Sequence, residues 1–159
     1  MWRPPRKSVT NRIRLYLYVS MKIRTAAQTT YQIGYHMVWG VKYHKHLLNK
    51  PMREYLVQII KAVCQAYNYN FYGLGIAPNH VHFFVGGPPK IAPAEIAMVV
   101  KSITTKEMFK KFPAIRQRLW GGHFWKDGYY VGTVGEGQIE AIVRQYLEKQ
   151  ETDQIATLK

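Results

Sequence analysis

Two histidines separated by a single residue, His80 and His82, are the first side chains in this sequence whose types and spacing suit chemistry. They lie in the segment HVHFFVG (80–86), whose β-branched and aromatic residues predict a strand. Side chains alternate between the two faces of a strand, so both imidazoles are expected on one face and Val81 and Phe83 on the other. Neighbouring imidazoles can hold a divalent metal, although such a pair is also common without any metal function.

A tyrosine and a glutamine one helical turn apart form a second candidate pair near the end of the chain. Residues 138–150 carry apolar residues at helical spacing, and Tyr146 and Gln150 share an apolar stripe with Ile139 and Val143. A tyrosine at that position is also typical of a core residue. Gln150 is more informative, because a buried amide without a hydrogen-bond partner or a metal costs about 1–3 kcal/mol. Solvation at a frayed helix end is the alternative for this amide.

These four side chains together suit the cleavage of a phosphodiester. Two imidazoles and one amide carbonyl are neutral ligands, which would leave Mg²⁺ or Mn²⁺ its full charge and open positions for the phosphate. The hydroxyl of Tyr146 could then attack the phosphorus and form a phosphotyrosine, which keeps the free energy of the ester for rejoining. Because the reference pKa of a phenol is about 10, this tyrosine needs activation, and the sequence shows no obvious general base. Tyr129 and Tyr130 are rival nucleophiles by chemistry alone.

Positioning these residues requires a sheet and several helices, and the hydrophobic pattern predicts them in a simple order. Strands are expected at 30–42, 70–77, 80–86 and 123–134, the last with a kink at Gly128, and helices at 51–67, about 93–112 and 138–150. This order predicts an α+β fold, the split βαβ (ferredoxin-like or RRM-like) antiparallel sheet with two helices on one face. A C-terminal helix then carries the candidate tyrosine. Gly135 and Gly137 precede that helix, either as a hinge or as an ordinary helix-start loop.

The length of 159 residues suits one domain, and we expect residues 21–159 to form it. Residues 1–20 are expected to be an N-terminal extension, either disordered or preceding the true start at Met21. No apolar run reaches the roughly 18 residues of a membrane span, and no signal peptide is recognised. The single cysteine, Cys64, excludes an internal disulfide framework and a cysteine-based zinc cluster. A cytoplasmic protein without a membrane partner is the simplest interpretation.

The balance of charge points to a polyanionic partner. Lys and Arg number 23 against 9 Asp and Glu, a formal charge of +14, and the basic residues are spread along the chain. Some of the 12 tyrosines and four tryptophans could stack on unpaired bases, while many must belong to the core. Candidate phosphate contacts, each of which could equally be a solvated surface charge, are Lys42, Lys45, Lys101, Lys106 and Lys110. The remaining histidines are interpreted as structural or as contacts to nucleic acid: His36, His44, His46 and His123.

Five segments, taken together and in order, resemble the single-tyrosine HUH transposases of bacterial and archaeal insertion sequences. They are YHMVWGVKYHKHLL (35–48), GIAPNHVHFFV (75–85), VVKSITTKEMFKKFP (99–113), LWGGHFWKDGYYVGTVG (119–135) and IVRQYLEKQ (142–150). The resemblance covers most of residues 30–150 and implies that His80 and His82 are the HUH histidines. It implies equally that Tyr146 is the nucleophile and that Gln150 is the third ligand of a Mg²⁺ or Mn²⁺ ion.

The resemblance further implies a DNA transposase that cleaves single-stranded DNA at hairpin-forming element ends through a 5′-phosphotyrosine, frees a 3′-hydroxyl and rejoins strands. The resemblance also implies a homodimer, in which the tyrosine helix of one copy can complete the active site at the histidines of the other copy. Gly135 and Gly137 would then be the hinge. Two alternatives stay open: a non-catalytic single-stranded nucleic-acid-binding module of the same fold, and a domesticated endonuclease that processes palindromes with the same tyrosine chemistry.

Overall fold

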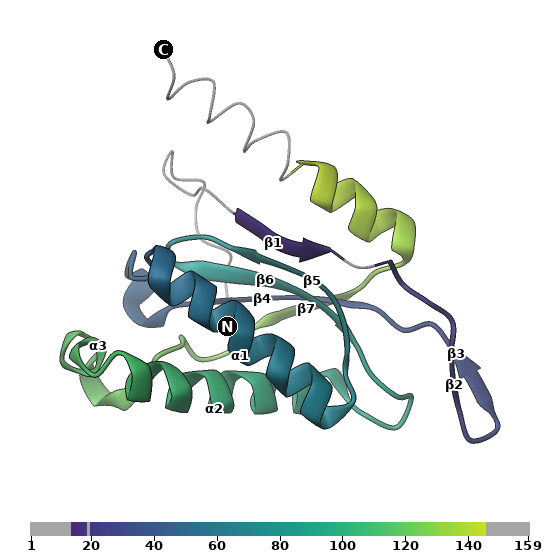
Figure 1. Ribbon diagram of the computed structural model, residues 1–159, viewed down its shortest axis with the longest axis horizontal. Coiled ribbons are helices and arrows are strands. Elements are labelled where there is room, and N and C mark those ends of the chain that lie inside the picture. The colour runs from purple at the N-terminus through teal and green to yellow at the C-terminus, as the bar shows by residue number, and fades with distance from the viewer. Residues whose placement is uncertain (1–13, 19, 146–159) are drawn as a thin grey trace, which may run out of the picture.

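Segments rich in β-branched and aromatic residues build one antiparallel sheet, and two long helices cover one of its faces (Figure 1). The computed structural model describes residues 14–18 and 20–145. The strands of the sheet are β1 (Arg14–Tyr18), β4 (Tyr35–Gly40), β5 (Asn70–Ile76), β6 (His80–Gly86) and β7 (Tyr130–Thr133). Their order across the sheet is β1-β5-β6-β4-β7, and each neighbouring pair is antiparallel. A separate hairpin, formed by β2 (Arg24–Ala26) and β3 (Thr29–Tyr31), precedes β4.

Both long helices have a proline in their first turn, where a missing N–H costs nothing. α1 (Lys50–Tyr67) follows Asn49, whose side-chain oxygen accepts a hydrogen bond from the backbone N–H of Met52 at 3.1 Å. It ends at Asn68, which adopts the left-handed conformation with φ 58°. α2 (Pro93–Lys111) ends shortly before another proline. Within the described residues, no helix combines the length and the hydropathy needed to cross a bilayer.

The strand order and the placement of the helices confirm the predicted split βαβ fold. β5, β6, β4 and β7 lie in the order that a ferredoxin-like sheet requires, and α1 and α2 pack on the same face. A short helix, α3 (Ala114–Arg118), follows α2 in the segment between the second long helix and the last strand. The fold is therefore α+β, as the hydrophobic pattern indicates.

Two predicted strands are shorter than expected. The segment 30–42 is divided, because Thr30 and Tyr31 pair in the hairpin and the sheet begins at Tyr35. Gly34 lies at this break, where an added Cβ would come within 2.7 Å of a backbone oxygen, so the close approach requires glycine. The segment 123–134 joins the sheet as a strand only over β7, since Gly128 turns the chain with φ 81°.

Part of the N-terminal extension belongs to the sheet. Residues 14–18 form β1 and pair with β5, from Arg14 opposite Ile76 to Tyr18 opposite Gly73. The last predicted helix, residues 138–150, is described over residues 136–145, and the rest of it lies outside the described residues.

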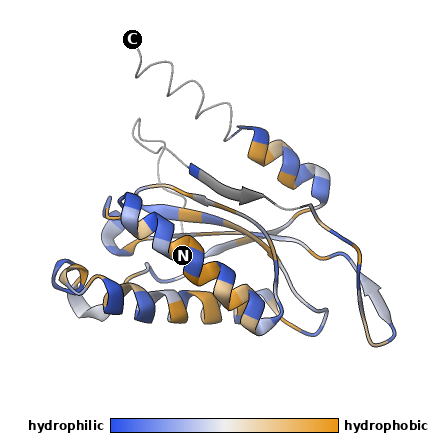
Figure 2. Cartoon of the chain, in the orientation of Figure 1, coloured by the Kyte–Doolittle hydropathy of each residue, from blue (hydrophilic) through white to orange (hydrophobic). Residues whose placement is uncertain are grey.

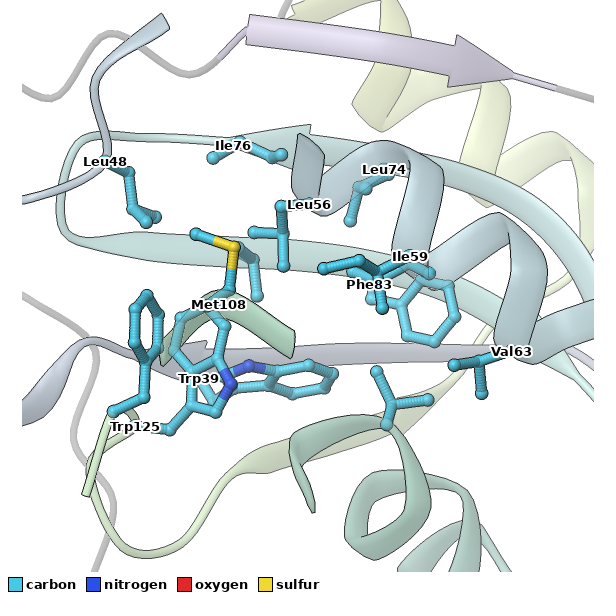
Figure 3. Close-up of a cluster of buried hydrophobic side chains, with 14 of the residues drawn as sticks. Trp39, Leu48, Leu56, Ile59, Val63, Leu74, Ile76, Phe83, Met108 and Trp125 are labelled. Carbon is cyan, nitrogen blue, oxygen red and sulfur yellow. The ribbon is translucent and has the colours of Figure 1, made fainter. Parts of the chain in front are cut away.

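The main hydrophobic core lies between the sheet and the two long helices (Figure 3). Leu56 and Val63 of α1 point into it from one side, and Trp39 of β4 points into it from the other. Trp125 packs edge to face against Trp39, with ring centroids 6.1 Å apart. Cys64 also belongs to this core, and burial raises the pKa of its thiol to about 12. A sheet held in this way on one face can present functional side chains on the other.

A second, smaller hydrophobic cluster on the other face of the sheet holds a further helix. Tyr72 and Phe84 point to that face from β5 and β6. Ile139 and Val143, from the helix over residues 136–145, pack against them and are 0% and 5% exposed. Figure 2 shows hydrophobic and hydrophilic residues alternating along this helix, as expected for an amphipathic helix. Figure 1 shows it on the side of the sheet opposite the two long helices.

Candidate functional site

β6 presents the two candidate histidines side by side on the face of the sheet away from α1 and α2. Val81 and Phe83 are buried in the main core, and His80 and His82 point the other way with ring centroids 5.0 Å apart. His80 is 3% exposed and His82 is half-buried. We call this side of the sheet, which also carries Phe84 and the second cluster, the histidine face. Two imidazoles at this separation can both reach one ion.

In each of the two rings, Nδ1 lies within hydrogen-bond distance of a neighbouring side chain. Nδ1 of His80 is 2.7 Å from Oδ1 of Asn79, an acceptor, and Nδ1 of His82 is 2.9 Å from Nε2 of His36. Asn79 is itself held in the turn between β5 and β6, where its carbonyl accepts from the N–H of Val41 at 2.8 Å. A ring that donates from Nδ1 carries a lone pair on Nε2, which is the state in which an imidazole binds a metal.

His36 is a member of this group of rings that the sequence reasoning missed. The sequence alone indicates a structural role or a nucleic-acid contact for it and does not link it to the histidine pair. In the sheet it lies opposite Phe84, and its ring stacks on Phe84 and on His82 with centroids 4.6 and 5.2 Å apart. The alternation of β4 places it on the correct face, but the pairing of β4 with β6 is needed to bring it beside His82.

Burial keeps two of these rings, those of His80 and His36, neutral. Burial, followed by the neighbouring His44 and His46, lowers the pKa of His80 to about 4. Burial alone lowers the pKa of His36 to about 4. Both imidazoles are therefore uncharged at pH 7, and an uncharged imidazole is what a metal ligand must be.

The histidine pair fits a divalent metal but needs a further ligand. Across residues 14–18 and 20–145, no three His, Cys, Asp or Glu side chains gather closely enough to hold an ion. The other two candidates, Tyr146 and Gln150, lie outside the described residues. The helix that leads to Tyr146 is described up to Gln145 and packs on the histidine face. An amide oxygen beside two neutral imidazoles would suit Mg²⁺ or Mn²⁺.

Neither glycine of the predicted hinge is needed to avoid a steric clash with the rest of the described chain. A Cβ at Gly135 or Gly137 would meet no atom within 4 Å. Gly135 instead begins the helix over residues 136–145, because its N–H donates to the side-chain oxygen of Gln138 at 2.8 Å and its carbonyl accepts from the N–H of Ile139 at 3.1 Å. The hinge role stays a prediction, and the absence of steric need makes it testable by substitution.

The two rival tyrosines occupy different environments. Tyr130, in β7, is 45% exposed and meets the ring of His36 edge-on with centroids 5.8 Å apart. Tyr129 is half-buried and packs against the main core. Tyr130 therefore borders the histidine face, and any assignment of the nucleophile must be tested against it.

The five candidate phosphate-contacting lysines do not share one surface. Lys101 belongs to α2, and its ammonium donates to the carbonyls of Lys126 and Gly128 at 2.9 and 3.0 Å, so it fastens the turn before β7. Lys106 and Lys110 are exposed on the same helix, which covers the opposite face of the sheet from the histidines. Lys42 and Lys45 lie in the loop after β4. A DNA contact by any of the five stays a prediction.

Two exposed aromatic residues on neighbouring loops were not singled out from the sequence. Trp120 is 82% exposed and Tyr43 is 56% exposed, and Tyr43 adopts a left-handed conformation with φ 61°. We call residues 42–46 and 119–123 the aromatic loops. The ammonium of Lys45 donates to the carbonyl of Arg118, the last residue of α3, at 2.5 Å and so joins the first loop to the start of the second. Composition alone cannot distinguish such aromatic residues from core residues.

The aromatic loops lie at the end of the sheet that carries His80. Gly40, directly before the first loop, pairs with His80 in the sheet, and the N–H of Val41 donates to the carbonyl of Asn79. The ammonium of Lys126 lies 3.0 Å from Nε2 of His44. Positive charge and exposed rings are therefore gathered at this end of the sheet.

The fold and the site define a class: a strongly basic α+β protein with a split βαβ sheet, a histidine pair on the face away from α1 and α2, and an amphipathic helix docked on that same face. A family model described as "Transposase IS200 like" matches residues 29–150. The chain belongs to this IS200-like transposase family, which confirms the resemblance found in the sequence.

Individual relatives agree with this family. The ISDra2 transposase TnpA of Deinococcus radiodurans is 26% identical over 135 residues, which cover 85% of this chain and 96% of the relative. The transposase for insertion sequence element IS200 of Salmonella typhimurium is 23% identical over 128 residues, or 79% of this chain and 84% of the relative. A crystal structure from Deinococcus radiodurans, of a protein assigned as a transposase, matches with a TM-score of 0.67 and 27% identity, covering 80% of this chain and 98% of that one.

Proposed function

We propose that this chain cleaves and rejoins single-stranded DNA at hairpin-forming ends of an insertion element. Tyr146 is the nucleophile, and a Mg²⁺ or Mn²⁺ ion is held by Gln150 together with the histidine pair. The observation that carries this proposal is the pair itself: His80 and His82 lie 5.0 Å apart by ring centroids, each with a partner at Nδ1, on the face where the helix leading to Tyr146 is docked. Membership of the family supports the same reaction class.

The chemistry divides between the ligands and the tyrosine. His80 and His82 provide neutral nitrogen ligands, and the side-chain carbonyl of Gln150 provides an oxygen ligand. The bound ion would polarise the phosphodiester and offset its charge. The phenolic oxygen of Tyr146 attacks the phosphorus and forms a P–O bond, while its proton passes to solvent. The bond from phosphorus to the 3′ oxygen breaks, and that oxygen takes up a proton and leaves as a 3′-hydroxyl. Attack of a 3′-hydroxyl on the 5′-phosphotyrosine reverses the step and rejoins a strand.

The aromatic loops are the part of the surface that we assign to unpaired nucleotides. Trp120 and Tyr43 are exposed on the aromatic loops, at the end of the sheet that carries His80, and bases of any sequence stack on such rings. Lys42 and Lys45 add positive charge at the same place, which favours the phosphate backbone. A hairpin stem held by the basic surface would thus present its single-stranded flank to His80.

The nucleophile is tested with a labelled DNA hairpin that carries a single-stranded flank, incubated with the protein and Mn²⁺. We expect a protein–DNA species that survives denaturing electrophoresis with the wild type. Tyr146→Phe should abolish this species and keep hairpin binding, whereas the matched control Tyr130→Phe should retain it. An adduct that survives in Tyr146→Phe, or that is lost in Tyr130→Phe alone, removes Tyr146 from the role. Hairpin binding without any wild-type adduct would favour the non-catalytic module instead.

The metal site is tested with His80→Ala, which should lose cleavage in Mn²⁺ while hairpin binding without metal persists. Undiminished cleavage by this variant would contradict a metal held by the pair.

We also propose a homodimer in which each tyrosine helix can serve the partner's histidines. Mixed dimers of Tyr146→Phe and His80→Ala chains provide the test, because an exchanged helix unites the intact tyrosine of one chain with the intact histidine of the other. Recovery of adduct on mixing is expected for exchanged helices. No recovery from demonstrably mixed dimers would assign each site to a single chain.

A further inference from the structure

His36 is a histidine of the histidine face that the proposed reaction does not use. Its ring lies in a stack, parallel to Phe84 within 15° and to His82 within 25°, and the ring of Tyr130 meets it edge-on. The pairing of β4 with β6 sets this position, because His36 lies opposite Phe84 and Val38 lies opposite His82. The strands on both sides therefore fix the plane and the depth of the His36 ring.

The contact between the two rings determines where His82 carries its proton. Nε2 of His36 and Nδ1 of His82 are 2.9 Å apart, and one hydrogen fills that space. When His82 is the donor, its Nε2 carries a lone pair and can bind a metal. When His36 is the donor, a neutral His82 must hold its proton on Nε2, and that nitrogen cannot bind a metal.

We propose that His36 is a positioning residue that accepts the Nδ1–H of His82 and thereby fixes the tautomer and the ring orientation in which Nε2 of His82 binds the metal. The proposal rests on the proposed function, since it requires His82 to be a ligand. Asn79 performs the same task for His80, with Oδ1 2.7 Å from Nδ1. Each ligand thus has its own acceptor, one from the turn before β6 and one from the neighbouring strand. Such outer partners of ligating histidines typically contribute 10- to 100-fold in metal affinity.

Two substitutions separate positioning from simple packing. His36→Phe keeps a flat ring that can stack on Phe84 and His82 but removes the acceptor. His36→Gln shortens the stack and restores an acceptor oxygen. If His36 only fills space, His36→Phe should bind Mn²⁺ as tightly as the wild type. If His36 acts through its acceptor nitrogen, His36→Gln should bind Mn²⁺ more tightly than His36→Phe.

The first measurement is the tautomer of His82 in the metal-free, full-length wild type, read from its ¹⁵N chemical shifts and long-range ¹H–¹⁵N couplings. We expect the proton on Nδ1. A proton on Nε2 overturns the proposal without recourse to any variant. Because this readout needs neither metal nor activity, it remains decisive even where a variant fails to fold.

The second measurement is Mn²⁺ affinity, obtained by counting free Mn²⁺ with electron paramagnetic resonance. We expect His36→Phe to weaken binding by about 10- to 100-fold, with glutamine recovering most of the loss and with the unfolding midpoint of the metal-free protein little changed. Wild-type affinity in His36→Phe overturns the proposal. His82→Ala distinguishes failure of the proposed metal site from failure of the proposed role of His36. If His82→Ala weakens Mn²⁺ binding and His36→Phe does not, only the role of His36 is refuted. If His82→Ala has no effect, the proposed metal site fails and the role of His36 fails with it.

Discussion

Replacing Ile139 by alanine should release the helix over residues 136–145 from the sheet without loosening the main core. Ile139 is fully buried in the second cluster, where it packs with Val143 against Tyr72 and Phe84 on the histidine face. Truncation of a buried isoleucine to alanine costs about 2–5 kcal/mol. Since each 1.4 kcal/mol changes an equilibrium tenfold, the population of undocked helix should rise by roughly 30-fold or more.

Hydrogen exchange followed by mass spectrometry measures this directly. Amides within residues 139–145 should exchange at least tenfold faster in Ile139→Ala, while those of α1 and β6 should keep their wild-type rates. The reason is that the sheet separates the second cluster from the core that holds α1. The yield of covalent DNA adduct should fall in parallel, because Tyr146 directly follows the docked segment.

Ile142→Ala is the matched control, since Ile142 is only partly buried against the same cluster and should give a smaller effect. Equal acceleration in α1 would show that the helix and the main core unfold as one unit. Unchanged exchange in residues 139–145 would show that the second cluster does not hold the helix. Either result refutes the reasoning.

Three further predictions concern the loops, the glycines and the histidine pair. Trp120→Ala should weaken binding of a single-stranded flank by roughly 5- to 150-fold, the equivalent of about 1–3 kcal/mol for one stacked base. The unfolding midpoint should not fall, because the Trp120 ring is 82% exposed. Unchanged affinity, measured by fluorescence anisotropy, would exclude Trp120 as a stacking residue. Alanine at both Gly135 and Gly137 should leave the fold intact and slow strand rejoining more than cleavage; equal rates for both steps would argue against a hinge. Burial lowers the pKa of His80 from 6.5 to about 4, so the unfolded chain binds the additional proton and the metal-free protein should lose stability as the pH falls from 6.5 toward 4. In urea unfolding, His80→Gln should flatten this part of the profile, and parallel profiles for the two proteins would contradict the assigned cause.

The features that the sequence predicts best are those set within one element. Alternation along β6 is sufficient to separate His80 and His82 from Val81 and Phe83, because the period of a strand is independent of its partners. Likewise, helical spacing and the proline in the first turn define α1 with an error of one residue. The order of these elements then leads to the split βαβ fold, since few topologies accommodate it.

The features that escaped prediction depend on pairing between distant segments. His36 joins the histidine pair only through the register of β4 against β6, and β1 becomes a strand only through its pairing with β5. The division of the segment 30–42 has a similar origin, because the close approach at Gly34 involves a backbone oxygen of Val134. One sequence carries no direct record of such register. The roles of Tyr146 and Gln150 stay predictions, because both lie beyond the last described residue.

The burial of Cys64 makes this chain convenient for optical studies. The thiolate is the form that reacts with maleimide dyes, and a thiol with a pKa near 12 stays protonated at neutral pH. A cysteine introduced at exposed Gln145 would therefore be labelled much faster than the native one, which need not be removed. A donor dye there and an acceptor dye on the DNA would report, in single molecules and in real time, whether the terminal helix leaves the sheet as the predicted hinge requires.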